Sequence, residues 1–200
     1  MTTRAQQYQE TRRRIIEAAA DAFSELGFHG ASTREIAARA GTNQGLITYH
    51  FRSKDELWKA AADQILSLLR TSFSLSSKGD AMNDDREQAR EAVRQYVRFA
   101  AAHPELFRLM VEEGKTADDR MQWLADNHLK PLYAGFERLL AEHVPGADNG
   151  MVPYAFYALA GASSLIFAVA PECRRLTGLD PARKQAVETH AEFIARLFVP

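Results

Sequence analysis

The most constraining feature of this sequence is a set of three helix-start signals placed close together. Ser32, Asn43 and Ser53 are residue types that cap helices, and Ser32 and Ser53 are each followed three positions later by Glu, as in a capping box. Gly41 separates the first two signals, and a glycine tolerates the left-handed backbone of a tight turn. We therefore expect two short helices and then a longer one, at residues 33–40, 44–50 and 54–73.

The rest of the chain shows the helical period as well. Apolar residues recur at helical spacing from Ile15 to Leu26, and Gly27 follows them, which predicts a helix at residues 9–26. Residues 74–85 are rich in Ser, Gly and Asp and predict a loop. Further helical patterns cover residues 86–102, 104–113, 117–143, 151–170 and 181–198.

Three prolines help to place the ends of these helices. Pro104 and Pro181 suit the first turn of a helix, where the missing amide hydrogen costs nothing. Pro131 falls inside a helical pattern and should kink or split it. No pattern of strands or repeats is present, so the expected fold class is all-α with about nine helices.

The composition indicates a folded protein of the reducing cytoplasm. Hydrophobic residues make up 46% and charged residues 26% of the chain, which argues against extended disorder. The only cysteine, Cys173, excludes an internal disulfide and a multi-cysteine metal site. The first residues are polar and basic, so no secretory signal is expected.

One uncharged segment, residues 151–170, has the length of a membrane span. It contains Pro153, Gly161 and two adjacent serines, and no basic cluster flanks it. These features favour a buried packing helix, and we expect no membrane contact.

The short capped helices at residues 33–52 are typical of a helix-turn-helix, whose second helix enters the DNA major groove. Gln44 lies near the N-terminus of that helix, and a glutamine amide can pair with both N6 and N7 of adenine. Gly45 allows the backbone to approach DNA closely. Residues 1–60 carry nine Lys or Arg and seven Asp or Glu, and the remainder is mildly acidic, which is compatible with a DNA-facing end.

The run from Thr33 to Leu57, with Tyr49-His50-Phe51 and Lys54 at the expected spacing, resembles the tetracycline-repressor (TetR) family of bacterial regulators. The resemblance covers about residues 10–60. Two positions depart from the family pattern: Thr48 replaces an aromatic residue, and Thr42 replaces a β-branched apolar residue. The resemblance implies contacts with double-stranded DNA from Thr33, Arg34, Asn43, Gln44, Gly45, Thr48, Tyr49, His50 and Lys54.

Some of these residues have a structural alternative. Phe51 fits a core position better than an interface, and His50 fits packing or a phosphate contact equally well. Arg34 and Lys54 are also compatible with ordinary solvated charges. Arg4 fits a flexible arm that touches DNA, and the basic run Arg12 to Arg14 fits either a DNA contact or a simple helix surface.

The expected domains are a DNA-binding domain at residues 9–69 and a ligand-binding and dimerisation domain at residues 70–200. A module this small contacts few base pairs, so specificity calls for a homodimer on a palindromic operator. The last two helices are expected to form a four-helix bundle with a second copy, as the resemblance also implies. The alternative is that they complete the core of one chain. The expected interface residues are Tyr157, Ala158, Gly161, Leu165, Val187, Ala191, Ile194 and Phe198.

The resemblance also implies a pocket for a small effector among the middle helices. We expect this effector to be largely apolar, and its binding to tilt the helix at residues 54–73 and release a repressor from its operator. For each side chain, core packing is the alternative. The expected pocket residues are Phe99, Phe107, Met110, Met121, Trp123, Leu124, Tyr133 and Phe136.

No pattern in the sequence points to an enzyme. The six histidines form no metal-spaced pair and no phosphate-binding glycine loop is present, so we expect no metal, no cofactor and no catalytic residue. The second hypothesis is an architectural DNA-binding protein, or an activator, without a small-molecule effector. In either case we expect a cytoplasmic, nucleoid-associated bacterial protein.

Overall fold

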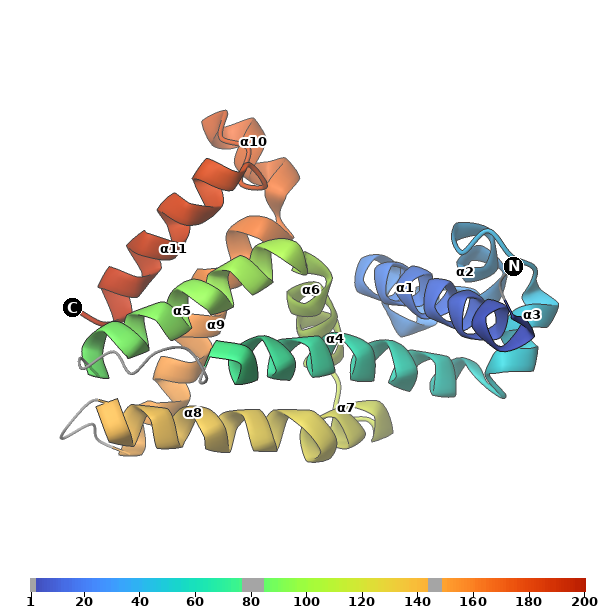
Figure 1. The fold of residues 1–200 in the computed structure, drawn as a ribbon, viewed down its shortest axis with the longest axis horizontal. Coiled ribbons are helices and arrows are strands. Elements are labelled where there is room, and N and C mark those ends of the chain that lie inside the picture. Colours follow the sequence, from blue (N-terminus) through green and yellow to red (C-terminus); the bar gives the residue numbers. More distant parts are fainter. Residues whose placement is uncertain (1–2, 77–84, 144–148) are drawn as a thin grey trace.

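The computed structural model describes residues 3–76, 85–143 and 149–200, and within them it is built of helices without a strand (Figure 1). The all-α class expected from the sequence is confirmed. A π-helical turn, Ala125–Leu129, joins α7 to α8, and a 3-10 turn, Asn149–Met151, precedes α9. The α-helices are α1 (Arg4–Gly30), α2 (Thr33–Arg39), α3 (Gln44–His50), α4 (Lys54–Ser76), α5 (Asp85–Ala102), α6 (Pro104–Glu113), α7 (Asp119–Leu124), α8 (Lys130–His143), α9 (Val152–Ala168), α10 (Ala170–Thr177) and α11 (Lys184–Phe198).

Helix α1 begins earlier than the apolar pattern predicted. The Thr3 hydroxyl accepts a hydrogen bond from the Gln6 amide at 3.2 Å, and the Gln6 side-chain oxygen accepts one from the Thr3 amide at 2.7 Å. This reciprocal cap makes residues 4–8 helical. Arg4 is therefore the first residue of α1, and the expectation that it lies in a flexible arm is wrong. Gly27 has a φ of 67° and breaks the helical path as expected, before one further turn that ends at Gly30.

The caps of α2 and α3 form at the predicted residues. The Ser32 hydroxyl accepts from the Glu35 amide at 3.1 Å, and the Asn43 side-chain oxygen accepts from the Leu46 amide at 3.0 Å. The Glu35 carboxylate bonds to Arg39 instead of reaching back to Ser32, so the first capping box is only half formed.

The predicted capping box before α4 forms with a shifted partner, since Glu56 bonds the amide of Arg52 and not that of Ser53. The Ser53 hydroxyl accepts from the Glu56 amide at 3.1 Å, and the Glu56 carboxylate accepts from the Arg52 amide at 3.0 Å. Helix α4 then continues to Ser76 and α5 begins at Asp85, which narrows the loop expected at residues 74–85. Residues 77–84 of that loop lie outside the described residues.

The prolines act mostly as predicted. Pro104 is the first residue of α6, and Pro131 lies in the first turn of α8, directly after the π-helical turn that splits the 117–143 pattern. Pro181 was placed wrongly: it is buried in a turn, and α11 begins only at Lys184. A bend at Val169 also ends α9 and starts α10, a helix that the sequence pattern did not predict.

Two hydrophobic clusters form the core. The first holds most of the buried residues of α1, α2 and α4, with Ile47 of α3, and it extends to Phe99, Leu106, Leu109 and Leu124. The second lies between α5, α9 and α11. We call α1 to α3 the head and α5 to α11 the body; α4 runs from one to the other (Figure 1). The division at residues 69 and 70 stays a proposal, since the first cluster spans it.

The uncharged segment at residues 151–170 forms α9 and the start of α10. In the described part of the chain, no single helix has the length and apolarity that a membrane span requires. Helices α9 and α10 meet that requirement only as a pair, and they are bent by 74°.

Candidate nucleic-acid interface

Helix α3 lies at the end of the molecule that holds the N-terminus (Figure 1). It turns Ile47 toward the core, and the buried Phe51 follows its last turn, as the sequence predicted for Phe51. Its other face carries Gln44, Gly45 and Thr48, which are all exposed. The predicted reading helix therefore presents its expected face outward.

The N-terminal end of α3 brings several of the predicted contact residues together. The Gln44 amide nitrogen donates to the Thr33 hydroxyl of α2 at 3.0 Å, which fixes the side chain beside the start of α2. Arg34 is exposed in the same first turn of α2. A Cβ on Gly45 would lie 3.1 Å from the Asn43 oxygen that caps the helix, so a glycine also leaves room for this cap.

The turn between α2 and α3 is braced from α1. Gly41 has a φ of 61°, and the guanidinium of Arg14 donates to the carbonyl oxygens of Ala40 at 2.8 Å and Gly41 at 3.1 Å. From the sequence, Arg14 was expected only as part of the basic run Arg12 to Arg14. Nothing local in the sequence reveals this contact, because 26 positions separate Arg14 from Ala40.

The C-terminal end of α3 carries an aromatic cluster. Tyr49 is 69% exposed, whereas His50 is half-buried. The ring of Tyr8 in α1 lies 4.4 Å from the His50 ring and 6.0 Å from the Tyr49 ring, measured between centroids. Burial, and then the charge of Arg12, lower the pKa of His50. Tyr8 was missed from the sequence because the helix was expected to start after it.

Lys54 points toward the end of α1. Its ammonium nitrogen lies 4.7 Å from the centre of the Phe28 ring, and the guanidinium of Arg120 lies 4.0 Å from the same ring. Burial, and then Arg120, lower the pKa of Lys54. The phosphate contact expected of Lys54 stays a prediction.

The residues expected to form an effector pocket separate into two groups. Phe99 and Leu124 are buried in the first cluster, and Met110, Met121 and Trp123 pack against it. Two rings of α8 instead contact Phe156 of α9: Tyr133 at 5.3 Å and Phe136 at 5.5 Å between centroids. Phe107 of α6 is half-buried.

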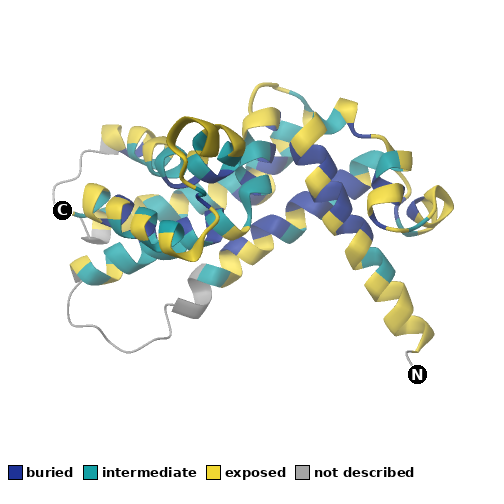
Figure 2. Cartoon of the chain, turned by 90° about the horizontal axis from the view of Figure 1, so that it is seen from above, coloured by how far each residue is buried: buried dark blue, intermediate teal, exposed yellow. Residues whose placement is uncertain are grey.

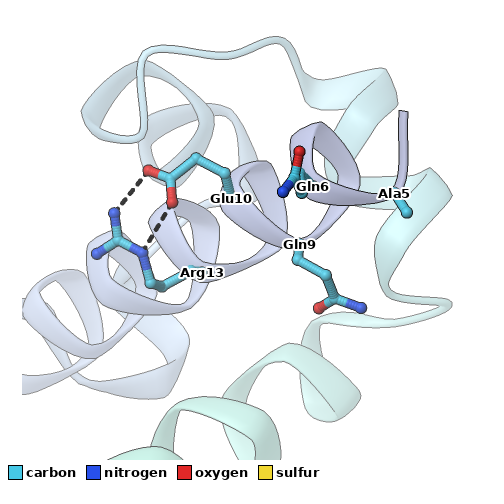
Figure 3. Close-up of a pocket in the computed structure, with 5 residues that line it drawn as sticks. All are labelled: Ala5, Gln6, Gln9, Glu10 and Arg13. Carbon is cyan, nitrogen blue, oxygen red and sulfur yellow. Dashed lines mark hydrogen bonds and ion pairs between the residues drawn. The ribbon is translucent and has the colours of Figure 1, made fainter. Parts of the chain in front are cut away.

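Two open surface hollows lie elsewhere. One is on the first turns of α1, beside the Glu10–Arg13 ion pair (Figure 3). The other follows α9 and α10, from Gly161 to Leu176. Neither contains an expected pocket residue, so the effector pocket stays a proposal. Among the described residues, no three His, Cys, Asp or Glu side chains gather in a way that could hold a metal ion.

The expected dimer residues do not share one surface. Tyr157 and Leu165 of α9 are 74% and 53% exposed, Ala158 is exposed and Gly161 is half-buried. In α11, by contrast, Ala191 and Ile194 are buried in the second cluster, with Val187 and Phe198 packed against it. Ala191 and Ile194 are therefore occupied within the same chain and do not fit an interface, whereas for the half-buried Val187 and Phe198 the interface stays a prediction. The exposed large apolar residues of α11 are instead Phe193 and Leu197, which were not among the expected interface residues.

The sequence of the head matches known regulators. Residues 15–61 match the family model of bacterial regulatory proteins of the tetR family. Over 59 residues the chain is 42% identical to the HTH-type transcriptional regulator BetI of Klebsiella pneumoniae, a match that covers 30% of this chain and 30% of BetI. The chain thus spans less than a third of the length of the curated relatives that it matches.

Solved structures share the fold over almost the whole chain. The fatty acid degradation regulator FadR from Bacillus halodurans has a TM-score of 0.71 and 18% identity, with 94% of both chains covered. AibR, solved in complex with isovaleryl coenzyme A and operator DNA, has a TM-score of 0.71 and 17% identity, with 95% of this chain and 98% of AibR covered. At these identities the likeness establishes the fold alone.

The exposed second helix and the matched residues define the head as a helix-turn-helix module. Within that class, residues 15–61 are similar to the DNA-binding part of the tetR family of bacterial regulatory proteins. The resemblance recognised in the sequence of the head is thus confirmed over residues 15–61.

Proposed function

We propose that the protein is a ligand-responsive repressor that binds a palindromic operator as a homodimer in the bacterial cytoplasm. The observation that carries this proposal is the outward face of α3, where Gln44, Thr48 and Tyr49 are exposed while Ile47 faces the core. A helix presented in this way can enter a major groove and read base edges. The proposed contact residues remain those predicted from the sequence.

The dimer is supported by exposed apolar side chains on the last three helices. Tyr157 and Leu165 of α9, Leu176 of α10, and Phe193 and Leu197 of α11 are all exposed in the single chain. A second copy that covers α9 and α11 would remove them from water, which is the main driving force for association. Two reading helices would then meet successive major grooves about 34–36 Å apart.

The effector proposal rests on the path of α4, which belongs to the first core cluster together with both the head and α6 and α7 of the body. A largely apolar ligand among the body helices would shift α4 and change the spacing of the two heads. A coupling free energy of about 1–3 kcal/mol between sites is typical, and it changes occupancy several-fold or more. Isovaleryl coenzyme A, with which AibR was solved, is a first compound to test, and only its isovaleryl chain matches the apolar ligand proposed.

Selection of bound sequences from random duplex DNA tests the function directly. The proposal predicts enrichment of one palindromic sequence, whose affinity falls steeply with salt. Enrichment of an asymmetric site would remove the dimer, and no enrichment at low ionic strength would remove DNA recognition itself. The enriched duplex then serves for effector titrations, in which equal affinity with and without every ligand offered would argue for a regulator without an effector.

A further inference from the structure

The first two turns of α1 lie outside both core clusters. Residues 4–10 are exposed, and Figure 2 shows this end of the helix extending away from the rest of the chain. The buried residues of α1 begin only at Ile15. Because Thr3 caps the helix through Gln6, the extension has a defined conformation and can place a side chain accurately.

Tyr8 is the residue through which this extension contacts α3. Its ring packs against the His50 ring at a tilt of 46° and meets the Tyr49 ring edge to face at 80°. One turn further along α1, the guanidinium of Arg12 lies 5.2 Å from the ring of Phe51. Since residues four apart share one face of a helix, Tyr8 and Arg12 together cover the C-terminal end of α3.

Helix α3 needs support from its neighbours at this end. It has seven residues, which is too short for a helix to be stable alone. The Asn43 cap and the Arg14 contacts hold its N-terminal end, and Ile47 holds its middle. At its C-terminal end, Tyr49 points outward, and Tyr8 is the aromatic neighbour that limits its orientation from α1.

We propose that Tyr8 is a positioning residue for DNA binding, whose ring holds Tyr49 and His50 in the orientation in which they reach the DNA backbone. This role rests on the proposed function and deepens it. Tyr8 acts through its two neighbours and makes no DNA contact of its own. Without the ring, Tyr49 and His50 sample more orientations, and ordering them on DNA weakens binding.

The first test compares substitutions of Tyr8 on the duplex enriched by selection. Tyr8→Ala is expected to weaken binding about three- to tenfold, the scale of a lost aromatic pair. Tyr8→Phe keeps the ring and should bind like the wild type. Gln9→Ala changes the exposed neighbouring residue and is the matched control, with unchanged affinity. Equal losses for Tyr8→Phe and Tyr8→Ala would show that the hydroxyl acts directly, and would overturn the proposal.

A double-mutant cycle distinguishes positioning from an independent contact. The effect of Tyr8→Ala is measured again in a protein that already carries Tyr49→Ala and His50→Ala. If Tyr8 acts through these two residues, its substitution costs nothing further in that background. Additive losses would mean that Tyr8 contributes by itself, because residues that act independently show additive free energies.

A second readout needs no DNA. Burial lowers the pKa of His50, so Tyr8→Ala should return this pKa toward its ordinary value in an NMR titration of the ring, whereas Gln9→Ala should not. An unchanged His50 pKa would contradict the packing on which the proposal depends.

The two proposals fail in different ways. If the wild type binds a duplex and Tyr8→Ala binds it equally well, the positioning role alone is wrong. If the wild type binds no duplex, the proposed function fails as well.

Discussion

At the scale of single residues, the outward face of α3 is held in place by contacts within the head. Gln44 is tied to Thr33, and the Asn43 side chain is committed to capping the helix. Side chains ordered in this way lose less conformational entropy when they bind a partner. The contact expected from Gln44 therefore depends on α2 as well as on α3.

Substitution of Gln44 should affect a single position of each half-site. Gln44→Ala is expected to cost about 1–3 kcal/mol at the base pair that the amide reads, with little change at other positions. Competition binding with operators mutated one base pair at a time measures this. A uniform loss on every sequence would show that Gln44 does not read a base.

Substitution of Lys54 tests the expected phosphate contact. A phosphate contact predicts that Lys54→Ala weakens binding evenly on all sequences and reduces the salt slope by about one. Affinity measured over a range of salt concentrations gives the slope. An unchanged slope would instead assign Lys54 to the contact with Phe28 seen in the structure.

At the scale of elements, α4 is connected to the body through the π-helical turn Ala125–Leu129. His128 of this turn is buried, with Nε2 2.8 Å from an oxygen of Asp63 and Nδ1 2.9 Å from a guanidinium nitrogen of Arg70. Both partners belong to α4. A neutral imidazole fits these neighbours, because Nδ1 can then accept from the guanidinium, while Nε2 lies beside the carboxylate without hydrogen-bond geometry.

This arrangement predicts a pH dependence of stability. Burial is the largest effect on the pKa of His128 and lowers it; Asp63 raises it and Arg70 lowers it further. The unfolded chain, with a His pKa of about 6.5, then binds more protons than the folded chain below that pH. The free energy of unfolding should therefore fall as the pH drops from about 7 to 5.5.

Urea denaturation across this pH range measures the effect. His128→Gln should make the fall shallower but not abolish it, because burial also lowers the pKa of His50 and His190. A wild-type protein that becomes more stable on acidification would contradict the sign. An identical pH dependence in His128→Gln would show that His128 is not its source.

Much of the element structure was predictable because its causes are local. Caps at Ser32 and Asn43 and the breaks at Gly27 and Pro131 depend on residues within a few positions of one another. The bend at Val169 also had a local signal that was not used, because Pro171 lies in the first turn of α10 and charged residues follow it.

The candidate site was predictable only in part, because some of its contacts are local in the chain and others are not. The outward face of α3 follows from helical spacing alone. Arg14 contacts the turn before α3, and Tyr8 contacts the end of α3. These contacts join residues far apart in the chain and leave no periodic signal in the sequence. In α11, apolar residues occur on two sides of the helix, and only the packing of α5 decides which of them is buried.

At the scale of the whole molecule, the exposed apolar residues of α9 to α11 are the part of the surface that needs a partner. We expect Leu165→Glu to make the protein monomeric, because a second copy would bury the new charge. Sedimentation velocity measures the change. Leu26→Glu, at a 42% exposed leucine of α1, is the matched control and should remain dimeric. A dimeric Leu165→Glu protein would place the interface elsewhere, and a monomeric wild type would remove the proposed dimer.

The central claim is that two copies of α3 read one duplex at a fixed separation. The most direct test is to insert about five base pairs, half a turn of DNA, between the half-sites of the selected operator. The account predicts two chains on the original duplex and loss of sequence-specific affinity on the lengthened one, because its half-sites face opposite sides of the helix. One chain per duplex, or equal affinity for both duplexes, would contradict it.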